Sequence, residues 1–360
     1  MEKKLFSGKN ILIGILYIIG FIVLLLVLLV LYLTLTEYKP DQVTSMVIDY
    51  ADINEVPTKT SFKAVSFNLG YGALGEEEDF FMDGGKKVYP DSVEVVEKNL
   101  AGILEVLKDI DADFHLLQEV DKNSKRSFSI DQQAYLEDTI LGLPSFYAEN
   151  YKVKFVPIPF PPMGKVDSGL VTSAKYNILE VDRISLFVPF KWPVRIANLK
   201  RSLLVTRMPV ENTGQDLVLI NLHLEAYDDS GGREKQTQEL MALMEDEVAK
   251  GNYVIAGGDF NQSFFPLEDL PYESAEDQWE PGLLDLNLFS EEFHILRDES
   301  MTPTCRSNHI AHTAYEGRKY YYYIDGFIVS DNINVEKIEV YDQGFKFSDH
   351  NPVVLAFSLK

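Results

Sequence analysis

Six short segments between Phe67 and His350 carry the residue types that phosphodiester hydrolysis needs. They are Phe67-Asn68, Gln118-Glu119, Asn221-Leu222-His223, Gly258-Asp259-Phe260-Asn261, Ile324-Asp325 and Ser348-Asp349-His350. Together they supply carboxylates for a hard divalent cation, amides that can hold phosphate oxygens, and two histidines for proton transfer. Strand-like sequence precedes nearly all of them, which predicts that strand ends bring them together. The set therefore predicts a metal-dependent phosphoesterase.

Two segments carry carboxylates that could hold a metal or a metal-bound water. Glu119 follows the apolar run Phe114–Leu117, at a strand end where a charged side chain can turn into a cleft. Asp259 and Asn261 follow two glycines, which permit close approach of a ligand, so Asp259 could orient water and Asn261 could hold a phosphate oxygen. The alternatives are a solvated turn residue for Glu119 and an ordinary Gly-Asp turn for Asp259.

His350 is the strongest candidate for a group that binds or protonates the phosphate in the transition state. A histidine in that role needs a carboxylate to fix its tautomer and raise its pKa. Asp325, at the end of the run Tyr320–Ile324, is the natural partner, which leaves Asp349 to contact metal or water. The alternative is a turn with an exposed histidine.

Asn68 and His223 are candidate site residues mainly because the other segments are present. Alternation along the strand that ends at His223 places Asn221 and His223 on one face, yet a lone strand-end histidine is more often structural. Asn68 ends the first strand and could orient a metal ligand or phosphate, and a turn cap is the alternative.

Two loops and one spacing are weaker signals. The proline-rich stretch Val156–Gly164 and the aromatic stretch Phe190–Arg195 could form a substrate rim or contact membrane headgroups, with Arg195 as the candidate substrate-binding residue. Rigid surface loops are the alternative. Cys305, His309 and His312 suggest zinc only superficially, because no fourth ligand or suitable spacing supports such a site.

The N-terminus predicts a membrane anchor. Ile11–Thr36 has no formally charged residue, and about 20 apolar residues suffice for a helix to cross the hydrocarbon core. The run is too long for a typical signal-peptide core, and no small-residue cleavage site follows it. Because Lys3, Lys4 and Lys9 precede it, we expect a single-pass cell-membrane protein with its catalytic part outside the cytoplasm. A cleaved signal peptide is the alternative.

Composition limits the partners. The chain has 56 Asp+Glu against 33 Lys+Arg, a net charge of -23, which argues against a basic surface for nucleic acid. A metal ion would still supply local positive charge for hydrolysis of an anionic substrate. The single cysteine, Cys305, excludes an internal disulfide. Nothing in the sequence predicts an obligate protein partner.

The hydrophobic pattern predicts a layered α/β or α+β fold behind a polar linker. Helices are expected at Val93–Ile110, Gln132–Leu141 and Gly231–Lys250, and strands at Ser61–Phe67, Phe114–Leu117, Gly169–Thr172, Ile184–Val188, Leu203–Val205, Leu217–Leu222, Tyr253–Ala256, Lys319–Val329, Asn334–Tyr341 and Val353–Phe357. The strands at 319–329 and 334–341 are expected to be neighbours. The predicted organisation is a cytoplasmic segment (1–10), an anchor (11–36), a linker (37–60) and a catalytic domain (61–360).

From about Ser61 to Lys360 the chain resembles the endonuclease/exonuclease/phosphatase superfamily, which includes DNase I, apurinic endonucleases, neutral sphingomyelinases and inositol-polyphosphate 5-phosphatases. The motifs that carry the resemblance occur in the family's order. They are Ser66-Phe67-Asn68, Leu117-Gln118-Glu119-Val120-Asp121, Ser168-Gly169-Leu170, Ser173-Ala174-Lys175-Tyr176, Asn221-Leu222-His223-Leu224, Gly258-Asp259-Phe260-Asn261, Ile324-Asp325 and Ser348-Asp349-His350-Asn351-Pro352.

The resemblance implies a DNase I-like, four-layer α-β-β-α sandwich with its site at one end of the two sheets. It implies that Glu119 binds Mg²⁺ or Mn²⁺ with Asn68 and Asp349 nearby. It also implies that Asp259 orients the attacking water, that Asn261 holds the phosphate, and that His350 with Asp325 stabilises the transition state. A histidine at 223, where apurinic endonucleases place a tyrosine, points away from DNA repair.

These observations favour a membrane-anchored, extracytoplasmic, Mg²⁺-dependent phosphodiesterase or phosphomonoesterase. Lipid headgroups are the favoured substrate class, because an anchor keeps the site near a bilayer. The first alternative is an extracellular DNase I-like nuclease. The second is a non-catalytic scaffold on the same fold, which should have lost the metal acid or the histidines.

Overall fold

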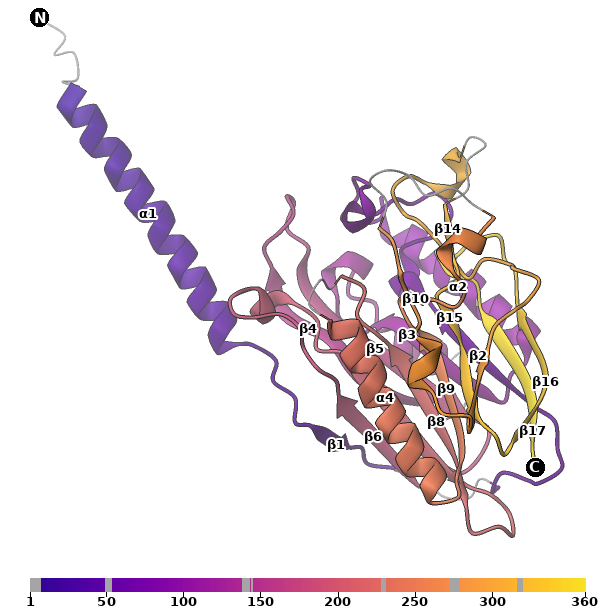
Figure 1. Ribbon diagram of the computed structural model, residues 1–360. Coiled ribbons are helices and arrows are strands. Elements are labelled where there is room, and N and C mark those ends of the chain that lie inside the picture. Colours follow the sequence, from indigo (N-terminus) through magenta and orange to yellow (C-terminus); the bar gives the residue numbers. More distant parts are fainter. Residues whose placement is uncertain are drawn as a thin grey trace, which may run out of the picture.

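The computed structural model describes residues 8–48, 54–137, 143, 145–227, 231–271, 279–315 and 320–360. Two β-sheets pack face to face and a long helix covers the outer face of each, so the two sheets and their helices form the expected four-layer sandwich (Figure 1). The helices are α1 (Gly8–Leu35), α2 (Val93–Ile110), α3 (Gln132–Leu136) and α4 (Gly232–Ala249).

The described residues form one sheet of seven strands and one of six. The first has the order β1 (Val43–Ser45), β6 (Glu180–Ser185), β7 (Ser202–Pro209), β8 (Asp216–His223), β9 (Tyr253–Asp259), β15 (Asp325–Ser330) and β12 (Phe293–Leu296). The second has the order β16 (Ile333–Val340), β17 (Val353–Leu359), β2 (Phe62–Asn68), β3 (Phe114–Asp121), β5 (Gly164–Ala174) and β4 (Ser145–Val156). Two short pairs join β10 (Gln262–Ser263) to β11 (Gly282–Leu283), and β13 (Cys305–Arg306) to β14 (Tyr321–Tyr322).

The central strands are apolar on both faces because each sheet is covered on both sides. In β2, Ala64 belongs to the core between the sheets, whereas its neighbour Val65 packs toward α2. In β8, Leu219 faces the inter-sheet core and Ile220 packs toward α4. This two-sided burial explains why these strands read as continuous hydrophobic runs.

Both long helices form where the pattern predicts them. The apolar positions of α2 recur at helical spacing, and Ile103 and Leu107 are buried against the six-stranded sheet. Asp111 adopts a left-handed conformation (φ 47°) just after the last turn, which ends the helix. Beyond α4, Gly251 has φ +86°, as expected of a glycine that stops a helix.

Helix α1 stands apart from the sandwich and projects away from it (Figure 1). It has 28 residues and is therefore about 42 Å long. Its apolar side chains are exposed almost throughout, with Leu33 buried near its end. The helix is long and apolar enough to span a membrane, although a signal sequence would share these properties.

Several predicted strands differ from those observed. The expected strand at 319–329 is instead the short β14 followed, after a break, by β15, and Lys319 lies outside the described residues. The prediction that it neighbours the strand at 334–341 is wrong, because the chain crosses between sheets at Asp331 and Asn332. Strand β6 ends at Ser185, short of the predicted Val188, and helix α3 covers 132–136 of the predicted 132–141, with 138–142 outside the described residues.

The segment predicted as a linker contributes to the sandwich. Strand β1 pairs antiparallel with β6, so that Val43 lies opposite Ile184 at the sheet edge. Val56 is fully buried in the inter-sheet core, and its N–H donates to the carbonyl of Pro209. Residues 49–53 of this segment lie outside the described part of the chain.

His115, in β3, makes stability depend on pH. Its imidazole is buried, and neither ring nitrogen has a hydrogen-bond partner among the described residues. Burial lowers its pKa from 6.5 to about 4. Between these values the unfolded chain binds one more proton than the folded chain, so stability falls as the pH falls.

We expect His115 to cost about 3 kcal/mol of stability at pH 4 relative to neutral pH. Replacement by leucine, which cannot be protonated, should remove that part of the pH dependence. Urea unfolding of the native chain and His115→Leu at several pH values measures it. Equal slopes of unfolding free energy against pH for the two proteins would contradict this prediction.

Candidate active site

The register of three strands brings three predicted site residues side by side. In the parallel pair β8 and β9, His223 lies opposite Asp259. In the antiparallel pair β9 and β15, Asp259 lies opposite Asp325. The ends of β8 and β9 and the start of β15 therefore meet at one edge of the seven-stranded sheet.

The six-stranded sheet contributes from the facing edge. Strands β2 and β3 run parallel, and Asn68 lies opposite Gln118. The sequence predicts that Glu119 follows this strand. In the structure it lies inside β3, at an irregularity between Leu117 and Val120. Its φ of 54° is rare for a residue with a side chain, and such bulges re-aim side chains at functional sites. The distortion turns the Glu119 carboxylate toward the pocket that the two sheet edges share.

The turns beside these strands hold Asp349 and His350. His350 lies just before β17, and the hydroxyl of Ser348 donates to the carbonyl of Asn68, which ties this loop to the end of β2. Gly70 has φ +51°, and a Cβ there would lie 2.6 Å from Asp349 Oδ1. Glycine is therefore required for the close approach of these two loops.

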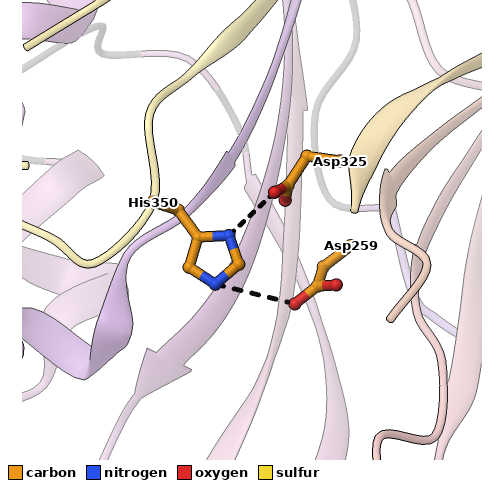
Figure 2. Close-up of side chains that lie close together, drawn as sticks. All are labelled: Asp259, Asp325 and His350. Carbon is orange, nitrogen blue, oxygen red and sulfur yellow. Dashed lines mark hydrogen bonds and ion pairs between the residues drawn. The ribbon is translucent and has the colours of Figure 1, made fainter. Parts of the chain in front are cut away.

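His350 lies between two carboxylates (Figure 2). Its Nδ1 is 2.9 Å from Asp325 Oδ2, and its Nε2 is 3.8 Å from Asp259 Oδ2. On the other side of Asp259, His223 Nε2 lies 3.3 Å from the same Oδ2 atom. All four residues are at most 5% exposed. The predicted His350–Asp325 pair is therefore present, with Asp259 between the two histidines.

The two histidines have opposite electrostatic surroundings. Burial alone would lower the pKa of His350, but the charge of Asp325 outweighs it and holds that pKa well above the usual range. Burial, reinforced by the nearby Arg201, keeps the pKa of His223 well below the usual range. Burial and the charge of Asp325 raise the pKa of Asp259 to about 7. Near neutral pH, these shifts favour a protonated His350 and a neutral His223.

Asn68 and Asn261 both hold Asp259 in place. The side-chain amide of Asn68 donates to Asp259 Oδ2 at 3.1 Å, while its oxygen accepts from the Gly70 N–H at 3.0 Å. The backbone N–H of Asn261 donates to Asp259 Oδ1 at 2.9 Å. The Asn261 side chain also donates to the Leu224 carbonyl and lines the pocket, where its second amide proton can face a ligand.

Glu119 and Asp349 offer oxygen atoms suited to a hard cation. About a quarter of the Glu119 side chain is exposed, and no described residue donates it a hydrogen bond within normal distance. Burial and the charge of Asp349 raise the pKa of Glu119. Asp349 accepts from the Asn308 side chain at 2.6 Å and also lines the pocket. A largely buried carboxylate without a hydrogen-bond donor, such as Glu119, fits a divalent cation, for which oxygen is the preferred ligand atom.

Among the described residues, Asp259, Asp325 and His350 form the one group of three such side chains whose ligand atoms all lie within 4.8 Å of one another. There, however, the His350 Nδ1 and Asp325 Oδ2 atoms bond to each other, so neither is free for an ion. That arrangement suits proton transfer rather than metal ligation. The cysteine–histidine spacing forms no such group in this part of the structure: His309 contacts Ser307, and His312 contacts Tyr321.

The structure does not bring Arg195 to the site. Its guanidinium pairs with Glu37 at 2.8 Å, and it is absent from the pocket wall. Arg201, six residues later and just before β7, lines the pocket instead. It is 5% exposed, its Nε has no hydrogen-bond partner, and its nearest carboxylate, on Glu225, is 3.9 Å away. The sequence signal was the basic pair Lys200-Arg201, but only the fold distinguishes Arg201 from Arg195.

The site forms the floor of a pocket of about 330 Å³. Polar groups that the sequence did not single out also line it, including Asp83, Asn308 and Tyr227, which are linked because Tyr227 and Asn308 both donate to Asp83. Much of the remaining wall is apolar and comes from Phe80, Phe81, Met82, Ile158, Met163, Phe190 and Trp279. The pocket thus combines a charged floor with an apolar wall.

Comparison with known proteins agrees with this architecture. The model of the Endonuclease/Exonuclease/phosphatase family matches residues 65–350. An endonuclease/exonuclease/phosphatase from Beutenbergia cavernae superposes with a TM-score of 0.53 at 18% identity, over 83% of this chain and 72% of that one. One from Bacteroides vulgatus gives 0.53 at 15% identity, over 84% and 100%.

A third similar structure is D. rerio TDP2 complexed with single strand DNA product, with a TM-score of 0.52 at 14% identity, over 83% of this chain and 100% of that one. A search of curated proteins gave no match. At these identities the structural likenesses show a common fold.

Proposed function

Because the chain belongs to the Endonuclease/Exonuclease/phosphatase family, we propose that it is a Mg²⁺- or Mn²⁺-dependent phosphoesterase that hydrolyses phosphoester bonds of lipid headgroups. Members of this family are generally hydrolases of phosphoester bonds and typically depend on a divalent metal. The observation that carries the proposal is the convergence of His350, Asp259 and Glu119 on one pocket, with Asp325 hydrogen-bonded to His350.

The side chains divide the work of hydrolysis. Asp259, with its pKa near 7, orients a water molecule and accepts its proton as the water attacks phosphorus. His350, kept protonated by Asp325, donates to a phosphoryl oxygen as negative charge develops there. Asn68 and Asn261 keep Asp259 in one orientation. Neutral His223 lies close enough to Asp259 to share in that proton network.

Glu119, with Asp349 beside it, would hold the divalent cation. The ion would neutralise charge on the phosphate and polarise the ester for attack. The available ligand atoms support this assignment. Glu119 is a carboxylate that lines the pocket, and no described residue donates a hydrogen bond to it.

The lipid assignment rests on the apolar wall and on α1. The same pocket is lined by Phe81, Ile158 and Phe190, which suit acyl or glyceryl groups better than a hydrated polyanion. Without residues 1–10, which carry +2, the chain has a net charge of -25, and this charge opposes binding of nucleic acid.

The test is a substrate screen with the full-length protein in detergent. Sphingomyelin, phosphoinositides, glycerophospholipids and single- and double-stranded DNA are each offered with Mg²⁺, with Mn²⁺ and with EDTA. We expect metal-dependent release from a lipid, absent in His350→Ala. Cleavage of DNA alone would make the protein a nuclease, and inactivity on every substrate would favour the scaffold.

Arg201 should contribute to binding of the anionic substrate. Its charge acts on both Glu119 and His223, and its Nε has no hydrogen-bond partner among the described residues. A hydrogen bond to a charged group is worth about 1.5–3 kcal/mol, so Arg201→Met should raise KM about 10- to 100-fold with a smaller effect on kcat. Arg297→Met is the control and should leave KM unchanged, because Arg297 pairs with Glu299 and does not line the pocket. An effect of equal size in both variants would contradict this role.

A further inference from the structure

Two loops on the same side of the sandwich expose large apolar side chains. One connects β4 to β5 and carries Ile158 and Phe160, and the other connects β6 to β7 and carries Trp192 and Val194. These four residues are called the apolar rim here. Phe160 is 95% exposed and Trp192 is 56% exposed. Exposure of large apolar side chains to water is unfavourable, and a cluster of them marks an interaction surface.

The β6–β7 loop is attached to the end of α1. The indole N–H of Trp192 donates to Thr34 Oγ1 at 3.1 Å, within the last turn of the helix. Two residues beyond α1, Glu37 is nearly buried between Arg195 and Lys200, at 2.8 and 3.7 Å. These contacts fix α1 against the sandwich, so a membrane that contains the helix must end close to this loop.

The charge of both loops is opposite to that of the chain. Residues 152–165 contain Lys152, Lys154 and Lys165 and no acid. Residues 186–201 contain Lys191, Arg195, Lys200 and Arg201 and no acid. In a chain with 56 acidic residues, a basic region around exposed aromatic side chains matches the anionic surface of a lipid bilayer.

Both loops also form part of the pocket wall. Ile158 contributes from the first loop and Phe190 from the second, while the hydroxyl of Tyr151 in β4 donates to the carbonyl of Ala197 and joins the two loops. The apolar side of the pocket therefore borders on the rim.

We propose that the apolar rim inserts into the bilayer that holds α1, so that the pocket receives its substrate from the membrane surface. This inference rests on the proposed function for the identity of the substrate, and on α1 as the anchor. Phe160 and Trp192 then lie at the level of the headgroups, with the exposed Lys154 and Lys191 facing anionic lipid.

Tryptophan fluorescence of the full-length chain tests the proposal without any enzyme assay. The chain has two tryptophans, so Trp279→Phe leaves Trp192 as the only reporter. On a Trp192→Phe, Trp279→Phe background, Phe160→Trp reports on the other loop of the rim. Leu179→Trp on the same background is the matched control. Leu179 is also exposed, but it precedes the first residue of β6, and the length of β6, about 20 Å, separates it from the β6–β7 loop.

Each protein is reconstituted in vesicles of phosphatidylcholine and phosphatidylglycerol with a nitroxide high on the acyl chain. We expect the nitroxide to quench Trp192 and the Phe160→Trp reporter about threefold more than the Leu179→Trp reporter, and aqueous iodide to give the reverse order. The proposal is overturned if the Phe160→Trp reporter behaves like the control, or if it is shielded from both quenchers, as burial against a second copy would produce. Quenching without lipid hydrolysis would remove only the proposed function, and lipid hydrolysis without quenching would remove only this inference.

Discussion

His350→Ala is expected to lower kcat by about 10²- to 10⁴-fold, the range that one proton-transferring side chain contributes. The imidazole is the only ring nitrogen donor within reach of both Asp325 and Asp259 in the described site. Steady-state kinetics on whichever phosphoester the screen identifies would measure the loss. Because the side chain is buried, circular dichroism must show that the variant is folded.

Asp325→Asn should shift the pH dependence of activity by changing the pKa of His350. Without the carboxylate, burial dominates and the pKa of His350 falls. The protonated imidazole is then lost at a lower pH, so the alkaline limb of kcat/KM should move to lower pH.

His294→Ala, which replaces an exposed histidine paired with Asp331, is the matched control for His350→Ala and should retain full activity. Activity in His350→Ala within a fewfold of the native chain would rule out His350 as the proton donor.

Glu119→Gln is expected to abolish metal-dependent activity and to weaken binding of Mn²⁺ by at least about tenfold. The substitution keeps the shape of the side chain and removes the charge that a cation would neutralise. Isothermal titration with Mn²⁺ and thermal unfolding with and without the ion measure binding directly. The metal-dependent rise in Tm of the native chain should be absent from the variant.

The same variant should be more stable than the native chain when metal is withheld. Burial and Asp349 raise the pKa of Glu119, which means that its negative charge opposes folding at neutral pH. Glu97→Gln, on the exposed face of α2, is the control and should change neither Mn²⁺ binding nor stability without metal. Native-like Mn²⁺ binding in Glu119→Gln would move the metal site elsewhere in the pocket.

The residue types and their order were enough to predict the family, the layered fold and most of the charged floor of the pocket. Helix α2 has the bounds that its apolar periodicity predicted, and β8 and β9 end where the polar residues begin. These features are local, because a helix or a doubly covered strand is encoded by the spacing of its own apolar residues.

The sequence could not place residues whose position depends on strand register or loop packing. Glu119 lies within β3 rather than after it, since a backbone bulge there has no sequence signal. Arg195 and Arg201 are equivalent as basic residues near an aromatic loop, yet one pairs with Glu37 and the other enters the pocket. Asp83, from a stretch without a recognised motif, joins the site through Tyr227 and Asn308.

The sequence by itself determined which chemical groups are available and which elements carry them. Only the tertiary structure decided that His350 lies between two carboxylates, and that the loops bordering the pocket lie beside the end of α1. The physical reason is distance along the chain. Asp259 and His350 are brought together by pairing and packing of strands from both sheets, and such contacts depend on the whole fold rather than on any local pattern.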